Sequence, residues 1–325
     1  MKKIVIDTVG ADAGLQPVVD GIAKAFDCGV EFFPVLVGPA PELENMLSQR
    51  KISCDRYELV DAADAVTNED PPTCVFAGKE ESSLVKAYQR LKSDDECCAM
   101  VSAGSTGALL VGSICRLGLL PGLKFPVLGS ALPCAPEDLV CLVDCGANVE
   151  CTAADLVRFA KMGVVFSRCH CGIDDPRVGL MSVGREEGKG TALTREAYEK
   201  LKALPVNFVG NLEGSDLVSG YADVVVTDGF SGNILLKSTE AAGKLAMQIV
   251  GEAGKDADPA LIEAIQRAIF KKLEFNSQGA ATFLGPKKIV VKMHGCANED
   301  TTVSAICHAL QLEESGFIEA MRQAL

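Results

Sequence analysis

The sequence predicts an α/β fold with three layers, α/β/α, around a mostly parallel sheet. Short apolar, β-branched runs alternate along the chain with amphipathic segments of helical period, which is the pattern of a sheet covered by helices on both faces. Polar, glycine-bearing loops follow several of the apolar runs. With 325 residues the chain can bury a large core, and we expect residues 1–325 to act as a single catalytic unit.

The stretch 206–237 shows this pattern most clearly. It reads VNFVGNLEGSDLVSGYADVVVTDGFSGNILLK. Strand-like runs at 206–209 and 224–227 each end in a glycine-bearing polar loop, and an amphipathic segment follows each loop. The sequence therefore predicts two successive strand-loop-helix units. The helix from Gly232 should point its N-terminal amides toward the loop edge of the sheet, where an anion could bind.

The remaining elements follow from the same periodicities, taken in order along the chain. Pro17 occupies a position that proline favours at the start of a helix. Residues 127–132 and 139–144 flank a proline-containing turn and predict a hairpin. Further strands are predicted at 3–7, 31–37, 57–61, 98–101, 177–183 and 289–293, and helices from Pro17 and at 41–49, 80–92, 109–117, 152–167, 194–202, 232–250, 259–273 and from Thr301.

Composition excludes several classes of protein. The net charge of −13 argues against general nucleic-acid binding, because phosphate contacts need clustered lysine and arginine. No apolar run reaches the roughly 18 residues of a membrane span, and the first strand-like run is too short for a signal segment, so we expect a cytoplasmic protein. The 14 cysteines contain no C-x-x-C pair. They are interpreted as small buried side chains, with a metal at Cys169, His170 and Cys171 as the alternative.

Five predicted strand ends lead into polar, glycine-rich loops, which together indicate an anionic ligand. These loops surround Gly10, Gly104, Gly146, Gly188 and Gly229. No G-x-G-x-x-G follows a strand, and the loop from Gly184 is one residue short of a P-loop, so a dinucleotide or nucleoside triphosphate is disfavoured. We expect no cofactor and no catalytic metal. Of the histidines, His308 lies in a predicted helix and should be structural, whereas His294 follows a strand and could touch a ligand.

Lys189 is the strongest single candidate for binding an anion. It stands between Gly188 and Gly190, so the backbone on either side can come close to a ligand. An ammonium group pairs with phosphate as a point charge. The alternative is an ordinary solvated loop lysine.

Five blocks in order along nearly the whole chain resemble signature segments of the bacterial phosphate acyltransferase family PlsX. They read SAGSTGA at 102–108, VDCGANV at 143–149, PRVGLMSVGREEGKG at 176–190, NFVGNLEGSDL at 207–217 and ADVVVTDGFSGNILLK at 222–237. The resemblance implies an enzyme that moves a fatty acyl group from acyl carrier protein to inorganic phosphate, giving acyl phosphate for phospholipid synthesis. It also implies a homodimer whose fold is similar to isocitrate and isopropylmalate dehydrogenases and to phosphotransacetylases.

Phosphate chemistry is consistent with the glycine-rich loops. Phosphate is already an oxyanion, so it needs orientation and partial charge neutralisation more than a covalent relay. We assign Lys189 to the phosphate or to the developing oxyanion, and Asn233 to orientation, as the catalytic residues. The predicted substrate-binding residues are Asp12, Ser105, Thr106, Gly107, Asn148, Asn211, Asp228, Gly229, Gly232 and His294. Two alternatives stay open: a phosphotransacetylase using coenzyme A thioesters, and a non-catalytic scaffold that binds the carrier protein.

Two positions depart from the family pattern, in which the first loop commonly reads Met-Gly-Gly-Asp and an asparagine precedes Thr-Gly-Ala. Here residue 11 is alanine, whose Cβ would penalise a positive φ, and residue 105 is serine. The helical segment at about 252–285 is the predicted site of dimer, membrane or carrier-protein contact. Its basic residues Arg267, Lys271 and Lys272 are the expected landing site for an acidic carrier.

Overall fold

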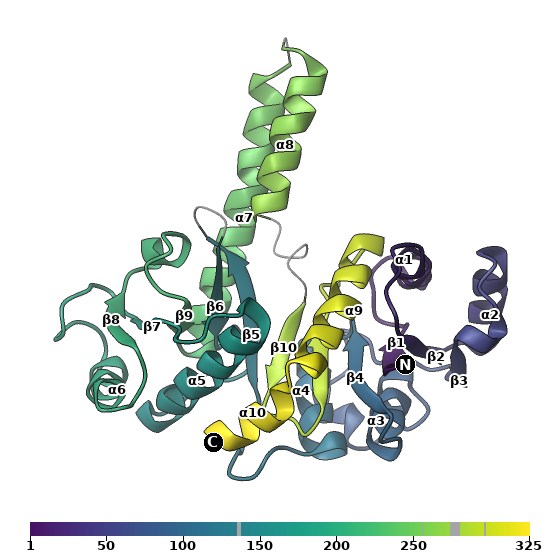
Figure 1. Cartoon of the computed structure of the whole chain (residues 1–325), viewed down its shortest axis with the longest axis horizontal. Helices are drawn as coiled ribbons and strands as arrows, with labels where there is room; N and C mark the ends of the chain where they lie inside the picture. Colours follow the sequence, from purple (N-terminus) through teal and green to yellow (C-terminus); the bar gives the residue numbers. More distant parts are fainter. Residues whose placement is uncertain (135–137, 256, 274–279, 296) are drawn as a thin grey trace. The chain divides into compact units, whose positions relative to one another are not determined.

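Two compact units make up the chain in the computed structural model, which describes residues 1–134, 138–255, 257–273, 280–295 and 297–325. Unit 1 comprises Met1–Leu128 with Gly279–Leu325, and unit 2 comprises Gly129–Gln278. The side chains of residues 270–273 lie outside the described part of the chain. Each unit has its own strands and helices, most of which Figure 1 labels along the chain.

The strands of unit 1 run mostly parallel in the order β3-β2-β1-β4-β11-β10, and β10 is antiparallel to β11. The C-terminal ends of β1, β4 and β11 therefore lie on one edge. The strands are β1 (Lys3–Asp7), β2 (Phe33–Gly38), β3 (Glu58–Asp61), β4 (Cys97–Ser102), β10 (Ala281–Leu284) and β11 (Ile289–Lys292).

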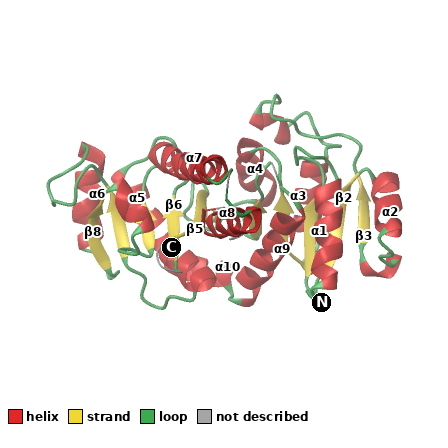
Figure 2. Cartoon of the chain, turned by 90° about the horizontal axis from the view of Figure 1, so that it is seen from above, coloured by secondary structure: helices red, strands yellow, loops and turns green. Residues whose placement is uncertain are grey.

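Helices lie on both sides of these strands (Figure 2). Helix α1 packs along α9, whereas α3 lies against β1, β2 and β4. The helices of unit 1 are α1 (Gln16–Asp27), α2 (Ala40–Gln49), α3 (Ser83–Ser93), α4 (Thr106–Gly112), α9 (Glu299–Glu314) and α10 (Phe317–Ala324), with short turns η1 (Cys54–Arg56), η2 (Pro72–Val75) and η3 (Ser113–Leu117).

In unit 2 the strand order is β5-β6-β9-β7-β8. The first two strands pair antiparallel, which confirms the predicted hairpin, and the other pairs are parallel. Four strands thus end on one edge, and the predicted mostly parallel α/β fold is confirmed for both units. The strands are β5 (Val127–Pro133), β6 (Leu139–Val143), β7 (Val178–Met181), β8 (Phe208–Leu212) and β9 (Val224–Val226).

The helices of unit 2 include a pair, α7 and α8, that lie side by side and antiparallel (Figure 1). Gln266 Nε2 of α8 donates to the carbonyl oxygen of Met247 in α7 at 3.1 Å. In the described ranges no helix combines the length and apolar character needed to cross a membrane. The helical segments are α5 (Ala153–Phe166), η4 (Ser167–Cys171), α6 (Ala192–Lys202), η5 (Gly214–Val218), α7 (Gly229–Ala253) and α8 (Pro259–Leu273).

The stretch 206–237 differs from its prediction in both strand-loop-helix segments. The strand lies at Phe208–Leu212, not at 206–209, so Gly210 and Asn211 belong to a strand and not to a loop. A short 3-10 turn, η5, follows it in place of the expected helix. The second helix begins at Gly229, three residues before the predicted start. Strand β10 was not predicted at all.

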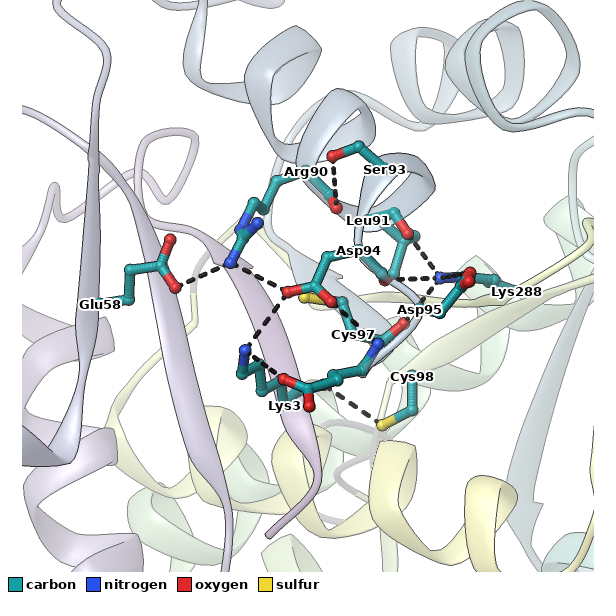
Figure 3. Close-up of polar contacts among 11 residues, drawn as sticks. Lys3, Glu58, Arg90, Leu91, Ser93, Asp94, Asp95, Cys97, Cys98 and Lys288 are labelled. Atoms are coloured by element: carbon teal, nitrogen blue, oxygen red, sulfur yellow. Dashed lines mark hydrogen bonds and ion pairs between the residues drawn. The ribbon is translucent and has the colours of Figure 1, made fainter.

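A polar network fixes the N-terminal edge of the unit 1 strands (Figure 3). Lys288 Nζ donates to the carbonyl oxygens of Leu91 and Asp94, both at 2.8 Å, and of Cys97 at 3.1 Å. Arg90 pairs with Asp94 at 2.9 Å and with a glutamate at the start of β3. Because this network occupies the edge where the strands begin, the opposite edge is left for the predicted ligand loops.

Candidate active site

The ends of β1 and β4 in unit 1 are joined through a buried carboxylate. Ser102 Oγ donates to Asp7 Oδ2 at 2.7 Å, and Ser102 Oγ also accepts from the backbone N–H of Gly104 at 3.0 Å. Asp7 is 1% exposed. Burial raises the pKa of the Asp7 carboxyl from its ordinary value of 3.8 to about 6, although hydrogen bonds from serine hydroxyls and the Val9 amide oppose this rise.

We expect Asp7→Asn to stabilise unit 1 at neutral pH. The folded carboxyl binds its proton more tightly than the unfolded one, so the free energy of unfolding falls as pH rises from 3.8 through about 6. Asparagine removes this dependence and keeps an acceptor for Ser102. Its advantage should be about 2 to 3 kcal/mol at pH 7.5 and should vanish below pH 4, measured by urea unfolding. A variant whose stability parallels the wild type at every pH would contradict the raised pKa.

The loop after β1 meets the segment after β11. The backbone N–H of Asp12 donates to the carbonyl oxygen of Gly295 at 2.8 Å, which places exposed Asp12 next to the half-buried His294 segment. Ala11 does not have a positive φ, so its Cβ causes no backbone strain at this departure from the family pattern. Two of the predicted substrate-binding residues are thus brought to one edge of unit 1.

The third loop of unit 1 leads from β4 into α4. Ser105 occupies the N-cap position, but its hydroxyl makes no capping hydrogen bond. Ser105 and Thr106 are half-buried at this helix start. A Cβ on Gly107 would come within 2.7 Å of the Pro72 ring, so this glycine lets η2 pack against α4. The packing role accounts for Gly107 without a ligand.

In unit 2 the loop after β6 is organised by Asp144, a residue that the sequence analysis did not single out. This side chain is fully buried. Its Oδ1 accepts from the backbone N–H groups of Gly146 at 3.0 Å and Ala147 at 2.9 Å. Its Oδ2 accepts from the backbone N–H and from Nδ2 of Asn148, both at 2.7 Å. Asn148 thus holds the loop together, and its side-chain amide is already engaged.

The start of α7 packs directly on this loop. A Cβ on Gly232 would lie 1.9 Å from the carbonyl oxygen of Asp144, and one on Gly229 would lie 2.7 Å from that of Asn148. Both positions therefore require glycine. The Gly229 N–H donates to the carbonyl oxygen of Asn148 at 2.8 Å.

The polar groups of this helix start are largely occupied from within the chain. Asp228 caps the helix by accepting from the Ser231 N–H and hydroxyl, both at 2.8 Å. The Gly232 N–H donates to the Asp228 carbonyl oxygen at 2.9 Å. Exposed Asn233 lies against Gly146, with its Oδ1 3.6 Å from the position of a Cβ there. Asn233 therefore stays the predicted ligand contact at this helix start.

The loop after β7 carries Lys189 and is held by β8. Asn211 Nδ2 donates to the carbonyl oxygen of Glu186 at 2.9 Å, and the Lys189 N–H donates to that same carbonyl at 3.0 Å. Asn211 is 3% exposed, and its Oδ1 has no hydrogen-bond partner among the residues the structure describes. The Lys189 side chain is exposed and forms no salt bridge within the described ranges.

Two other charged side chains of this loop are paired, whereas Lys189 forms no salt bridge within the described ranges. Arg185 forms an ion pair with buried Asp216, and Glu187 pairs with Lys202 at 2.6 Å. The arginine pair holds the pKa of the Asp216 carboxyl below its usual range. An unpaired ammonium group beside two glycines is available to an anionic ligand.

The structure groups the predicted site residues by unit. Asp12, Ser105, Thr106 and His294 lie at the strand-end edge of unit 1, and Lys189, Asn148, Asn211, Asp228 and Asn233 lie at that of unit 2. His308 is structural as predicted, because its Nε2 lies 2.6 Å from Thr282 Oγ1 in a buried position. Across the described residues, no group of three histidine, cysteine or acidic side chains could hold a metal.

Comparisons with known proteins agree with this architecture. The model of the fatty acid synthesis protein family matches residues 2–320. The chain is 33% identical over 327 residues to a phosphate acyltransferase of Clostridioides difficile, covering 99% of this chain and 95% of the relative. A phosphate acyltransferase of Bacillus cereus is 35% identical over 309 residues, 94% of this chain and 92% of the relative.

Solved structures show the same fold at low sequence identity. A phosphotransacetylase from Streptococcus pyogenes superposes with a TM-score of 0.63 at 19% identity, over 96% of this chain and 94% of that one. A branched-chain phosphotransacylase from Enterococcus faecalis superposes with a TM-score of 0.62 at 15% identity, over 96% and 98%. The expected likeness to the phosphotransacetylase fold is confirmed.

Proposed function

Because the chain belongs to the fatty acid synthesis protein family, we propose that it is a phosphate acyltransferase whose acyl donor is the thioester of acyl carrier protein. The names of its relatives support acyl transfer to phosphate. The observation that carries the site assignment is the unpaired Lys189 ammonium in a loop at the strand-end edge of unit 2. The prediction that residues 1–325 act as a single catalytic unit stays a prediction.

The reaction needs few protein groups. A hydrogen phosphate oxygen attacks the thioester carbonyl carbon, the C–O bond forms, and the C–S bond then breaks. The departing sulfur takes the proton that hydrogen phosphate carried, so acyl phosphate and a free thiol result. Lys189 orients the phosphate or offsets the charge on the developing oxyanion, and the Asn233 amide donates to the substrate. Asn211 positions the Lys189 loop, because its Nδ2 and the Lys189 N–H both donate to the carbonyl oxygen of Glu186.

The donor can be identified by measuring thiol release. We expect phosphate-dependent release of free thiol from palmitoyl-loaded acyl carrier protein and little from acetyl coenzyme A. Release from the coenzyme A thioester alone would instead identify a phosphotransacetylase. No release from either donor, with the loaded carrier still bound, would identify a scaffold.

The α7–α8 pair supports a proposed homodimer. Leu245, Ile249 and Leu261 are each more than half exposed on these helices, at 56%, 55% and 55%. We place this apolar stripe across a dimer interface, since the acidic Glu263 beside it disfavours contact with an anionic membrane surface. Carrier docking is proposed at the basic end of α8. Arg267 there pairs with Glu263 at 2.5 Å, whereas the side chains of Lys271 and Lys272 lie outside the described residues.

A further inference from the structure

Two thiols that the proposed reaction does not use face each other in unit 2. The sulfur atoms of Cys141 and Cys171 are 3.6 Å apart. Cys141 is fully buried and Cys171 is partly exposed. A solvent-borne reagent would therefore reach Cys171 first, with Cys141 directly behind it.

The backbone around Cys141 is rigid. Cys141 is the middle residue of β6, where it pairs with Ala131 of β5 on one side and Val224 of β9 on the other. Its N–H also donates to the carbonyl oxygen of Asp223 at 2.8 Å. This sulfur is held in place by a strand that is paired on both edges.

Cys171 lies at the end of a helical segment. It is the last residue of η4, the turn that continues α5, and Gly172 closes the turn with a φ of 71°. Closing the sulfur separation to a disulfide bond length of about 2.05 Å requires a movement of roughly 1.5 Å. A side-chain rotation of a residue at a helix end can provide this.

The chemistry of the pair separates it from most other cysteines of the chain. The hydrogen bond between the two thiols lowers the pKa of the Cys171 thiol and raises that of Cys141. By contrast, burial raises the pKa of Cys145, and it raises that of Cys151 to about 12. Thiolate character and partial exposure are the properties that make a cysteine react with oxidants.

We propose that Cys141 and Cys171 form a disulfide when the protein meets a peroxide. The sulfur of Cys171 attacks one peroxide oxygen, the O–O bond breaks, and water leaves, so that Cys171 becomes a sulfenic acid. The sulfur of Cys141 then attacks the sulfur of Cys171, the S–O bond breaks, and a second water leaves with the Cys141 proton. Two thiols are oxidised by two electrons, and the peroxide is reduced to two waters.

The disulfide would connect the site to the helix beside it. Cys141 lies three residues before Asp144, which organises the loop after β6, and Cys171 ends the turn after α5. The cross-link therefore encloses the Asp144 loop and the whole of α5 in one covalent ring. Such a ring restricts the unfolded chain and should make this part of unit 2 harder to unfold.

Peptide mapping of the full chain tests this proposal. Reduced protein is treated with hydrogen peroxide, its free thiols are alkylated under denaturing conditions, and the digest is analysed by mass spectrometry without reduction. We expect a peptide pair linked through Cys141 and Cys171, about two daltons lighter than its reduced parts, that dithiothreitol separates. The mapping needs no variant, so it does not depend on how well a mutant folds.

Two variants define the pairing. Cys171→Ser should abolish the linked peptide, whereas Cys169→Ser, on the same turn, should leave it intact. Full alkylation of Cys141 together with sulfinic acid at Cys171 would overturn the proposal, and so would a link from Cys171 to Cys134, which lies close enough for their charges to interact.

Discussion

Replacing Lys189 with alanine should lower acyl phosphate formation by on the order of 10²-fold or more while leaving the fold intact. The side chain is exposed and contributes little packing, so unfolding should barely change. Its ammonium has no salt-bridge partner in the described part of the chain, so its charge is available to the substrate. Steady-state rates of thiol release, with circular dichroism as a check on folding, measure both effects.

The same variant separates the two roles assigned to Lys189. If the ammonium binds ground-state phosphate, the KM for phosphate should rise; if it acts only on the developing oxyanion, kcat should fall at unchanged KM. Lys200→Ala is the matched control, because Lys200 is also exposed, on α6, and pairs along the helix with Glu196 at 3.5 Å. Wild-type turnover by folded Lys189→Ala would remove Lys189 from the mechanism.

The apolar period predicted the strands of this fold well where local pattern and tertiary pairing agree. The first strand, residues 3–7, and the hairpin formed by β5 and β6 lie where the sequence placed them, within a residue or two. The first strand ends at Asp7, β6 ends immediately before Asp144, and β5 ends at Pro133, so local composition marks these boundaries. Parallel pairing then brings the loops together, because the strands end on a shared edge.

Prediction failed where glycine was interpreted as a loop residue. Gly210 and Asn211 suggested a turn, yet they pair with Gly179 and Leu180 of β7 and extend β8. Gly229 and Gly232 likewise suggested a loop, but they form the first turn of α7. Glycine is needed at both positions because a Cβ there would collide with the loop after β6. Such glycines report the close approach of a distant segment, which a single sequence does not display.

The assignment of the site residues stays a prediction, and the structure shows what each of them contacts within the chain. Lys189 is exposed and unpaired in the described structure, as an anion-binding lysine should be. Asp228, Asn148 and Asn211, by contrast, are engaged in holding their own loops. A short polar residue after a strand can bind a ligand or build the loop that does so, and sequence spacing is the same for both. Asp144, the last residue of the predicted strand 139–144, was given no site role for this reason.

We expect Asp144→Asn to lower turnover by on the order of 10²-fold and to destabilise unit 2. The carboxylate accepts four N–H groups, and an asparagine must turn its own NH₂ group toward some of these donors. Bonds to a charged acceptor contribute about 1.5 to 3 kcal/mol each, so losing the two bonds on one oxygen should cost about 3 to 6 kcal/mol of the free energy of unfolding.

The loss of activity should follow from displacement of the loop, since Gly229 and Gly232 of α7 pack on its backbone and Asn233 follows them. Asp138→Asn is the control, because Asp138 is exposed just before the same strand and the substitution makes the same change of charge. Asp138→Asn should match the wild-type protein both in its free energy of unfolding by urea and in its rate of thiol release. If Asp144→Asn matched it in both, the buried carboxylate would have no part in building the site, and the start of α7 would be positioned by glycine packing alone.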